Sequence, residues 1–144
     1  MAPLAATILL IEPNLVLLKL VTLILEGSGF EVLVARSAQE AILIDVGFLG
    51  RIDLLLSSIT LPGTSGPELA KAMKERRHGM LVMFMSGYPD GAMLFLNYGW
   101  HFVTKPFVAA QLIARIKHVL TTATPEQSVD RFDTTGLNDA LPKL

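Results

Sequence analysis

The 144-residue chain contains no cysteine and few charged side chains. The lack of cysteine excludes disulfide bonds, cysteine-ligated zinc or iron–sulfur centres and thiol catalysis. Charged residues make up 17% of the chain and hydrophobic residues 51%, against roughly 25% charged in an average soluble domain. With 12 basic and 13 acidic side chains, the formal net charge is −1. This balance argues against a polyanion held by bulk electrostatics, so we expect no nucleic acid partner.

The chain also lacks an uninterrupted hydrophobic run long enough to span a membrane. Its most hydrophobic segment, residues 8–25, is broken by Glu12, Pro13, Asn14 and Lys19. The longest nearly apolar piece, residues 15–25, has about half of the roughly 20 residues that a spanning helix needs. No basic segment precedes the run, which disfavours a secretory signal. We therefore expect a cytoplasmic protein with no membrane partner.

Short apolar runs alternate with helical patterns along most of the chain. The runs have the length and β-branching of buried strands, and they cover residues 7–11, 30–35, 53–57, 81–85 and 102–103. Helices are predicted from Pro13 to 27–29, from Ser37 to about 48, from Ser65 to about 78, from 89 to 98, and over 109–120. Two of them begin with S-x-x-E capping boxes, Ser37 with Glu40 and Ser65 with Glu68.

Strands that alternate with helices need right-handed crossovers onto a parallel sheet. The predicted fold class is therefore α/β, a three-layer sandwich with a five-stranded parallel sheet and (βα)5 flavodoxin-like topology. We expect this domain to cover residues 1–121. Residues 122–144 lose the periodicity and gain Thr, Asp and Pro, which is typical of a tail or linker.

Polar side chains or prolines follow four of the predicted strands. They are Glu12 and Pro13 after the first strand, Ser57 and Ser58 after the third, Ser86 after the fourth, and Lys105 and Pro106 after the fifth. The carboxyl ends of parallel strands meet at one edge of a sheet, where ligands of such folds bind. We therefore expect any functional site at this edge.

Four motifs, ILLIE, DLLLSSITLPGTSG, FMSGYPD and FVTKPF, resemble in this order the receiver domain of two-component response regulators. The resemblance covers roughly residues 7–121 and is strongest to receivers fused to hybrid histidine kinases. In that family, an acidic pair after the first strand holds Mg²⁺ together with an Asp at the end of the third strand. This Asp takes a phosphoryl group from a histidine kinase, and a Ser or Thr and a Lys bind the phosphoryl oxygens.

The resemblance implies a role for individual positions of this chain. It places the acidic pair on Glu12 and Pro13, the phosphoacceptor on Ser58, the hydroxyl on Ser86 and the amine on Lys105. It also places the family's aromatic switch on Phe102 and implies a cis peptide bond before Pro106.

Two of these positions depart from the family pattern in a way that affects the chemistry. Mg²⁺ prefers carboxylate oxygens, but Pro13 has no side-chain ligand and Ser58 has only a neutral hydroxyl. The family pocket has three carboxylates and one lysine, so its net charge is negative. In this chain the charges of Glu12 and Lys105 cancel. We therefore expect a vestigial phosphorylation pocket with no metal, no cofactor and no acyl phosphate. In it, Lys105 is predicted to pair with Glu12 and to reach Ser58 or Ser86, because a partly buried ammonium needs compensation.

The first predicted helix indicates a second kind of site. The residues at i, i+3, i+4 and i+7 are predicted to face the sheet, and they are Leu17, Leu20, Val21 and Ile24. The opposite side, which should meet water, then carries Leu15, Leu18 and Leu23. Three leucines there favour a contact surface for a protein partner. The partner would be a histidine kinase, a phosphotransfer or output domain, or a second copy.

Three functions remain open from the sequence. The favoured one is a receiver-like interaction module, not an enzyme, that works independently of phosphorylation. The second is a phosphotransfer-competent receiver with an atypical acceptor, Asp53 or Asp90. Asp53, however, begins its strand, and Asp90 lacks an acidic pair. The third is a flavodoxin-like enzyme or nucleotide binder, which is disfavoured because no glycine-rich turn follows the first strand.

Overall fold

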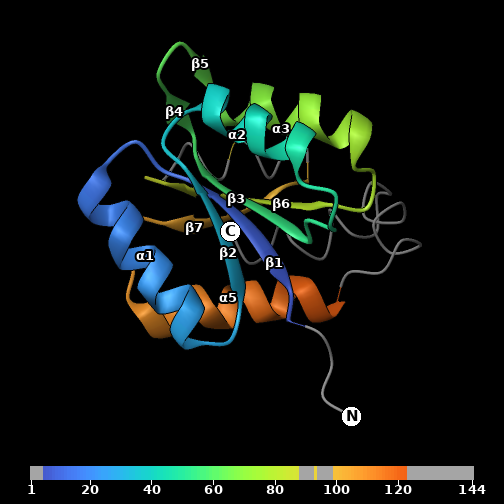
Figure 1. Ribbon diagram of the computed structural model, residues 1–144. Coiled ribbons are helices and arrows are strands. Elements are labelled where there is room, and N and C mark those ends of the chain that lie inside the picture. Colours follow the sequence, from blue (N-terminus) through green and yellow to red (C-terminus); the bar gives the residue numbers. More distant parts are fainter. Residues whose placement is uncertain (1–4, 88–92, 94–98, 123–144) are drawn as a thin grey trace.

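The computed structural model describes residues 5–87, 93 and 99–122 of the chain (Figure 1). The elements in chain order are β1 (Thr7–Ile11), α1 (Leu15–Gly27), β2 (Glu31–Ala35), α2 (Ala38–Gly47), β3 (Leu54–Ser58), β4 (Thr60–Leu61), β5 (Thr64–Ser65), α3 (Gly66–Arg76), β6 (Leu81–Ser86), β7 (His101–Thr104) and α5 (Ala109–Thr122). The predicted helix over 89–98, except for residue 93, and the predicted tail beyond Thr122 lie outside the described residues.

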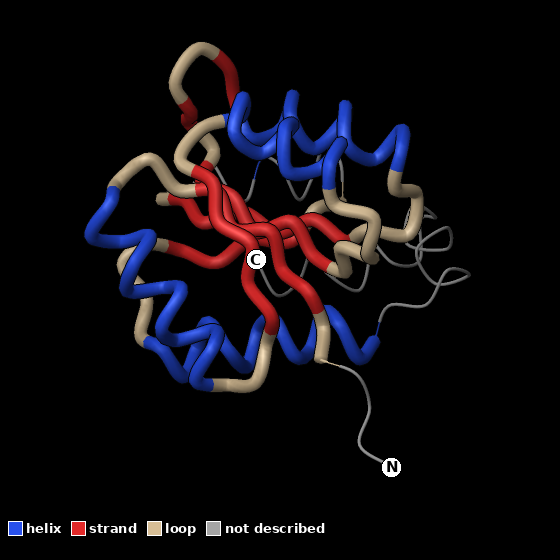
Figure 2. Tube along the Cα trace, in the orientation of Figure 1, coloured by secondary structure: helices blue, strands red, loops and turns tan. Residues whose placement is uncertain are grey.

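Five parallel strands form the central sheet in the order β2-β1-β3-β6-β7. Helices α2 and α3 cover one face of the sheet, and α1 and α5 cover the other (Figures 1 and 2). The predicted three-layer α/β sandwich with a five-stranded parallel sheet and flavodoxin-like topology is confirmed. No helix in the described part of the chain is long and apolar enough to cross a membrane.

The sheet has a hydrophobic core on each face, which explains the continuous apolar runs in the sequence. Alternate side chains of a strand point to opposite faces. Leu9 and Ile11 of β1 therefore join the core under α2 and α3, while Ile8 and Leu10 join the core under α1 and α5. All four are fully buried.

The predicted orientation of α1 is wrong in one respect. Its buried residues are Leu18, Val21 and Leu25, whereas Leu20 is 52% exposed. Leu18, which was predicted to face water, is therefore a core residue. Leu15 and Leu23 are exposed as predicted. Because apolar side chains stand on nearly every side of this helix, the sequence allows two inward stripes, and packing on the sheet selects the one through Leu18.

A small hairpin between β3 and α3 replaces the predicted loop. Strands β4 and β5 pair antiparallel around Gly63, whose φ of 75° is the left-handed conformation that glycine adopts at low cost. Helix α3 begins at Gly66, where a Cβ atom would collide with the backbone oxygen of Ser58 and the ring of Phe84. The glycine therefore allows α3 to start directly against the end of β3.

The serine half of each predicted capping box is confirmed at the starts of α2 and α3, whereas Glu40 accepts from the Arg36 amide and Glu68 from the Thr64 hydroxyl instead of from the N-cap amide. The Ser37 hydroxyl accepts from the Glu40 amide at 3.2 Å, and the Ser65 hydroxyl accepts from the Glu68 amide at 3.3 Å. Such caps satisfy amides that the first helical turn leaves without partners.

Candidate functional site

The site begins with Glu12, which follows β1 at the carboxyl edge of the sheet. Its amide donates to the carbonyl oxygen of Ala35 at 3.1 Å, which extends the β1–β2 pairing by one residue. Its side chain is buried, and Oε2 accepts from the amide of Asn14 at 2.9 Å. The Asn14 side chain in turn caps α1 by accepting from the Leu17 amide at 3.0 Å. The turn after β1 thus fixes the carboxylate.

Ser58 and Lys105 converge on the other oxygen of Glu12. The hydroxyl of Ser58, at the end of β3, donates to Oε1 of Glu12 in a short contact. The Nζ atom of Lys105 lies 3.1 Å from the same Oε1 and 3.2 Å from Oγ of Ser58. The predicted pairing of Lys105 with Glu12 and its reach to Ser58 are confirmed. The predicted cis bond between Lys105 and Pro106 is present.

Ser86 ends β6 beside this cluster and contributes through its backbone. Its carbonyl oxygen accepts from the Lys105 amide at 2.8 Å, which positions the residue after β7. Its hydroxyl is buried and, within the described part of the chain, has no hydrogen-bond partner. An unpaired buried hydroxyl is uncommon in folded proteins.

The two remaining predicted positions are Pro13 and Phe102. Pro13 is partly buried next to Glu12 and has no side-chain oxygen to offer. Phe102 of β7 is 9% exposed and belongs to the core under α2 and α3. Trp100 packs against the same core, with its ring 5.5 Å from that of Phe84.

The donor set does not fit a magnesium ion. Among the described residues, Glu12 is the only carboxylate of the cluster, and both of its oxygens already accept hydrogen bonds. An ammonium lies within salt-bridge distance of it, which cancels the charge that would attract a divalent cation. Across residues 5–87, 93 and 99–122, no group of three His, Asp or Glu side chains could hold a metal.

The alternative acceptor Asp53 lies at the opposite edge of the sheet. It precedes β3, where Oδ2 accepts from the amide of Thr7 at 2.8 Å and Oδ1 pairs with Nε of Arg51 at 2.7 Å. These contacts tie the amino ends of β1 and β3 together, far from the cluster around Glu12. Asp90, the other alternative, lies outside the described residues.

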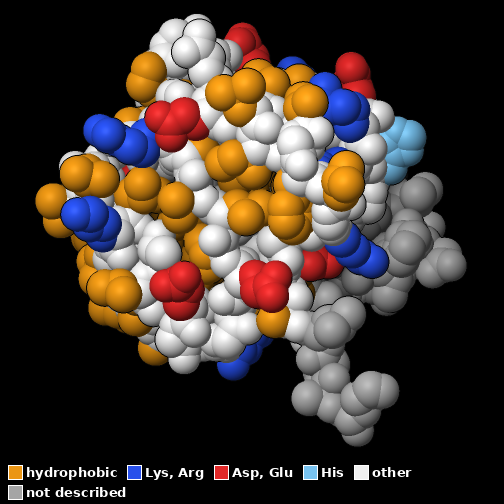
Figure 3. Space-filling model, in the orientation of Figure 1, with side chains coloured by type: hydrophobic (Ala, Val, Ile, Leu, Met, Phe, Trp, Pro, Cys, Tyr) orange, Lys and Arg blue, Asp and Glu red, His pale blue; other side chains and the backbone are white. Residues whose placement is uncertain are grey.

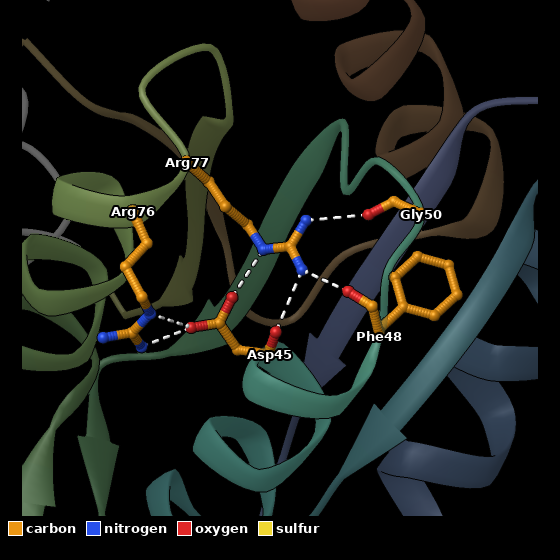
Figure 4. A network of polar contacts seen from close by, with 5 residues as sticks. All are labelled: Asp45, Phe48, Gly50, Arg76 and Arg77. Atoms are coloured by element: carbon orange, nitrogen blue, oxygen red, sulfur yellow. Dashed lines mark hydrogen bonds and ion pairs between the residues drawn. The ribbon is translucent and has the colours of Figure 1, made fainter.

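A second buried carboxylate, Asp45 of α2, was not identified from the sequence. Arg76 donates to its Oδ2 and Arg77 donates to its Oδ1 (Figure 4). Arg77 also donates to the carbonyl oxygens of Phe48 at 2.8 Å and Gly50 at 2.9 Å, which follow the end of α2. The cluster therefore links α2 and the loop after it to the end of α3.

The arginines also set the acidity of Asp45. Burial alone would raise its pKa, but hydrogen bonds and charge from Arg77 and Arg76 outweigh burial and hold the pKa below its ordinary value. A signal for this residue was available in the sequence. Asp45 follows Ala38 and Ala41 at the spacing of one helix face, and it is the only charged residue in the segment AILIDVG.

The fold and the cluster at its carboxyl edge define a doubly wound α/β domain with one polar site where the strands end. Residues 8–117 match the family described as response regulator receiver domain, and the chain belongs to this family. The resemblance that the strand-end motifs indicated is thereby confirmed at the level of the family.

Curated relatives agree with this assignment. The chain is 32% identical over 136 residues to the phosphate regulon transcriptional regulatory protein PhoB of Pseudomonas aeruginosa, covering 91% of this chain and 58% of that protein. It is 29% identical over 119 residues to the sensor kinase CckA of Brucella abortus, covering 81% of this chain and 13% of that protein. The chain thus spans only part of the length of these relatives.

Solved receiver domains share the fold. The receiver domain of the hybrid histidine kinase CckA is 31% identical, with a TM-score of 0.68 over 80% of this chain and 99% of that one. A receiver domain protein from Clostridium thermocellum is 28% identical, with a TM-score of 0.73 over 81% of this chain and 95% of that one. Receiver domains are in general non-enzymatic modules of two-component signalling, and by sequence and fold this chain is a receiver domain.

Proposed function

We propose that this receiver domain is an interaction module of two-component signalling that works without phosphorylation at its strand-end pocket. The observation that carries the proposal is the cluster of Ser58, Glu12 and Lys105. A hydroxyl occupies the acceptor position, so no carboxylate is present there to form an acyl phosphate. The lysine that would bind a phosphoryl group is already paired with Glu12.

The proposed partner is another protein. Relatives of the chain are named as transcriptional regulatory proteins and as a sensor kinase. A histidine kinase, a phosphotransfer or output domain, or a second copy of the chain therefore fits best. The formal charge of −1 favours protein over nucleic acid as the direct contact of this domain.

The decisive experiment is phosphorylation by acetyl phosphate in the presence of Mg²⁺, followed by intact-mass measurement. The unmodified protein is expected to gain no phosphoryl group. The matched control is the double variant Pro13→Asp with Ser58→Asp, which restores two carboxylates beside Glu12 and is expected to gain the group. A gain in the unmodified protein, mapped by fragmentation to Asp53 or Asp90, would support an atypical acceptor and contradict the proposal.

Metal titration separates the roles of the two altered positions. Ser58→Asp alone is expected to bind Mg²⁺ weakly, because Pro13 still supplies no ligand and Lys105 still pairs with Glu12. The double variant with Pro13→Asp is expected to bind at least tenfold more tightly. Equal binding by the single and double variants would refute the role assigned to position 13.

A further inference from the structure

Helix α1 is apolar on the side that faces water. Three of its residues are buried against the sheet. At about 100° per residue, the side directly opposite them carries Val16, Leu20, Leu23 and Gly27. All four are exposed, and Val16 and Leu23 are 78% and 68% exposed. A surface helix normally turns polar residues to water on this side, so the apolar stripe calls for a partner.

The spacing within this stripe is that of helices that pair with each other. Counted from Val16, its members follow at steps of four, three and four residues. Such alternating steps form the contact line between the helices of a coiled coil. The stripe covers less than two heptads, too few to hold two free helices together, but the domain already holds α1 in its helical form. We call Val16, Leu20, Leu23 and Gly27 the α1 seam.

The α1 seam lies open on the surface of the domain. Within the described part of the chain, α1 packs on β1, β2 and α5, and none of these elements covers the exposed residues of the seam. Figure 3 shows hydrophobic side chains gathered along α1 at the left of the molecule. Single exposed leucines are ordinary, but a contiguous apolar surface marks an interaction site.

Two charged residues border the α1 seam on one side. Lys19 and Glu26 each directly precede a seam residue, which is a position where charged side chains pair across a coiled coil. Both are exposed, and within the described residues neither side chain makes a hydrogen bond or an ion pair. The other border carries Leu17 and Ile24, which are partly buried and uncharged. The seam therefore has one charged border, with opposite signs at its two ends.

We infer that a second copy of this chain covers the α1 seam with its own α1, and that the two helices run antiparallel. A twofold axis that passes between Leu20 and Leu23 places each of these leucines opposite the other in the second copy. The same axis places Val16 of one copy over Gly27 of the other. A Cβ atom at Gly27 would meet nothing within 4 Å in its own copy, so there is room for the valine.

Charge complementarity identifies both the occupant and its direction. In the antiparallel pair, the charged borders of the two copies lie on the same side of the contact, so Lys19 of each copy lies beside Glu26 of the other. In a parallel pair, each charged border would face the uncharged border of the other copy, and Lys19 would lie beside Ile24. The seam with its charges is thus complementary to a second copy of itself in one direction.

The inference rests on the proposed function in one respect, because it selects one of the protein partners named there. It does not involve the pocket around Ser58. Phosphoryl transfer to the unmodified protein would contradict the proposed function and leave the dimer in place, whereas a protein that stays monomeric would contradict the inference alone.

The first test is the molar mass of the full chain in solution, measured by light scattering over a range of concentrations. A dimer that dissociates on dilution is expected. Leu23→Glu is expected to weaken it about tenfold or more, because each copy then buries a carboxylate against a leucine of the other. The matched control is Leu43→Glu on α2, which changes a leucine that is 74% exposed on the other face of the sheet and should leave the mass unchanged. A monomer at all concentrations, or dissociation by the control as readily as by Leu23→Glu, overturns the inference.

Charge exchange tests the antiparallel direction. Lys19→Glu and Glu26→Lys are each expected to weaken the dimer about fivefold at low salt, since each creates two like-charge contacts. The double variant should restore the dimer, and mixing the two single variants should give a heterodimer. If Leu23→Glu dissociates the dimer while no charge variant changes it, the antiparallel arrangement is wrong. Both charged positions are exposed, so these variants test the inference even if circular dichroism shows that Leu23→Glu alters the fold.

Discussion

Two carboxylates, Glu12 and Asp45, are buried to nearly the same degree, with 4% and 5% of their surfaces exposed, but their partners differ. Asp45 contacts two guanidinium groups, and one of these also binds carbonyl oxygens of the following loop. Glu12 contacts one hydroxyl, one backbone amide and one ammonium, and the lysine side chain is 32% exposed. The Asp45 cluster has the composition of a structural clamp. The Glu12 cluster lies where we propose a vestigial phosphorylation pocket.

The largest expected effect is at Asp45. Asp45→Asn leaves two arginines facing a neutral amide and is expected to lower the free energy of unfolding by about 3 kcal/mol. Urea denaturation at pH 7 measures this loss. The control Glu75→Gln changes an exposed carboxyl on the same helix as Arg76 and should cost less than about 0.5 kcal/mol. A loss at Asp45 no larger than that of the control would show that the clamp contributes little.

The contribution of Asp45 also depends on pH in a defined direction. Since its pKa is lowered in the folded state, its stabilising effect is complete above the unfolded pKa of about 3.9 and is lost as the pH falls through the folded pKa. The stability difference between the unmodified protein and Asp45→Asn should therefore be constant from about pH 7 to pH 5 and shrink below about pH 4. A difference that grows on acidification would contradict this assignment.

A smaller effect is expected at Lys105. Lys105→Met leaves the Glu12 carboxylate buried without its cation and should cost about 2 kcal/mol, less than Asp45→Asn because water still reaches this side of the pocket. Adding Glu12→Gln to this variant should recover most of the loss, as thermal or urea unfolding of the double-mutant cycle would show. A cost larger than that of Asp45→Asn would reverse the comparison between the two carboxylates.

The smallest effect is expected at Ser86. Its buried hydroxyl has no hydrogen-bond partner among the described residues, so Ser86→Ala should change the free energy of unfolding by less than about 0.5 kcal/mol. Ser58→Ala, by contrast, removes the donor to Glu12 and should cost about 1 kcal/mol. Chemical denaturation of both variants measures the two changes in the free energy of unfolding. Equal costs would mean that Ser86 has a partner after all.

The sheet and the Glu12–Lys105 pair could both be predicted from the sequence. The sheet follows from where the strands lie, and the pair follows from where they end. Residues at the carboxyl ends of parallel strands meet regardless of how the helices pack, so Glu12, Ser58 and Lys105 could be placed together in advance. The orientation of α1 could not be predicted in the same way. Leucines on most sides of that helix leave its hydrophobic pattern ambiguous, and only contact with the sheet decides between Leu18 and Leu20.

The Asp45 cluster was beyond prediction for a different reason. The spacing of Ala38, Ala41 and Asp45 indicates that the carboxylate faces inward, but it does not say which helix supplies the cations. Arg76 and Arg77 lie 31 and 32 positions away and reach Asp45 because α2 and α3 pack on the same face of the sheet. The hairpin of β4 and β5 was missed because strands of two residues carry no periodicity.

The ion pair between Glu12 and Lys105 joins residues 93 positions apart. Glu12 follows β1, the first strand in the chain, and Lys105 follows β7, the last strand of the sheet in chain order. The pair can close only when β7 has docked beside β6. During synthesis from the amino terminus, Glu12 therefore has no counterion from this pair until almost the whole domain has left the ribosome. Formation of this contact reports that the last strand has joined the sheet.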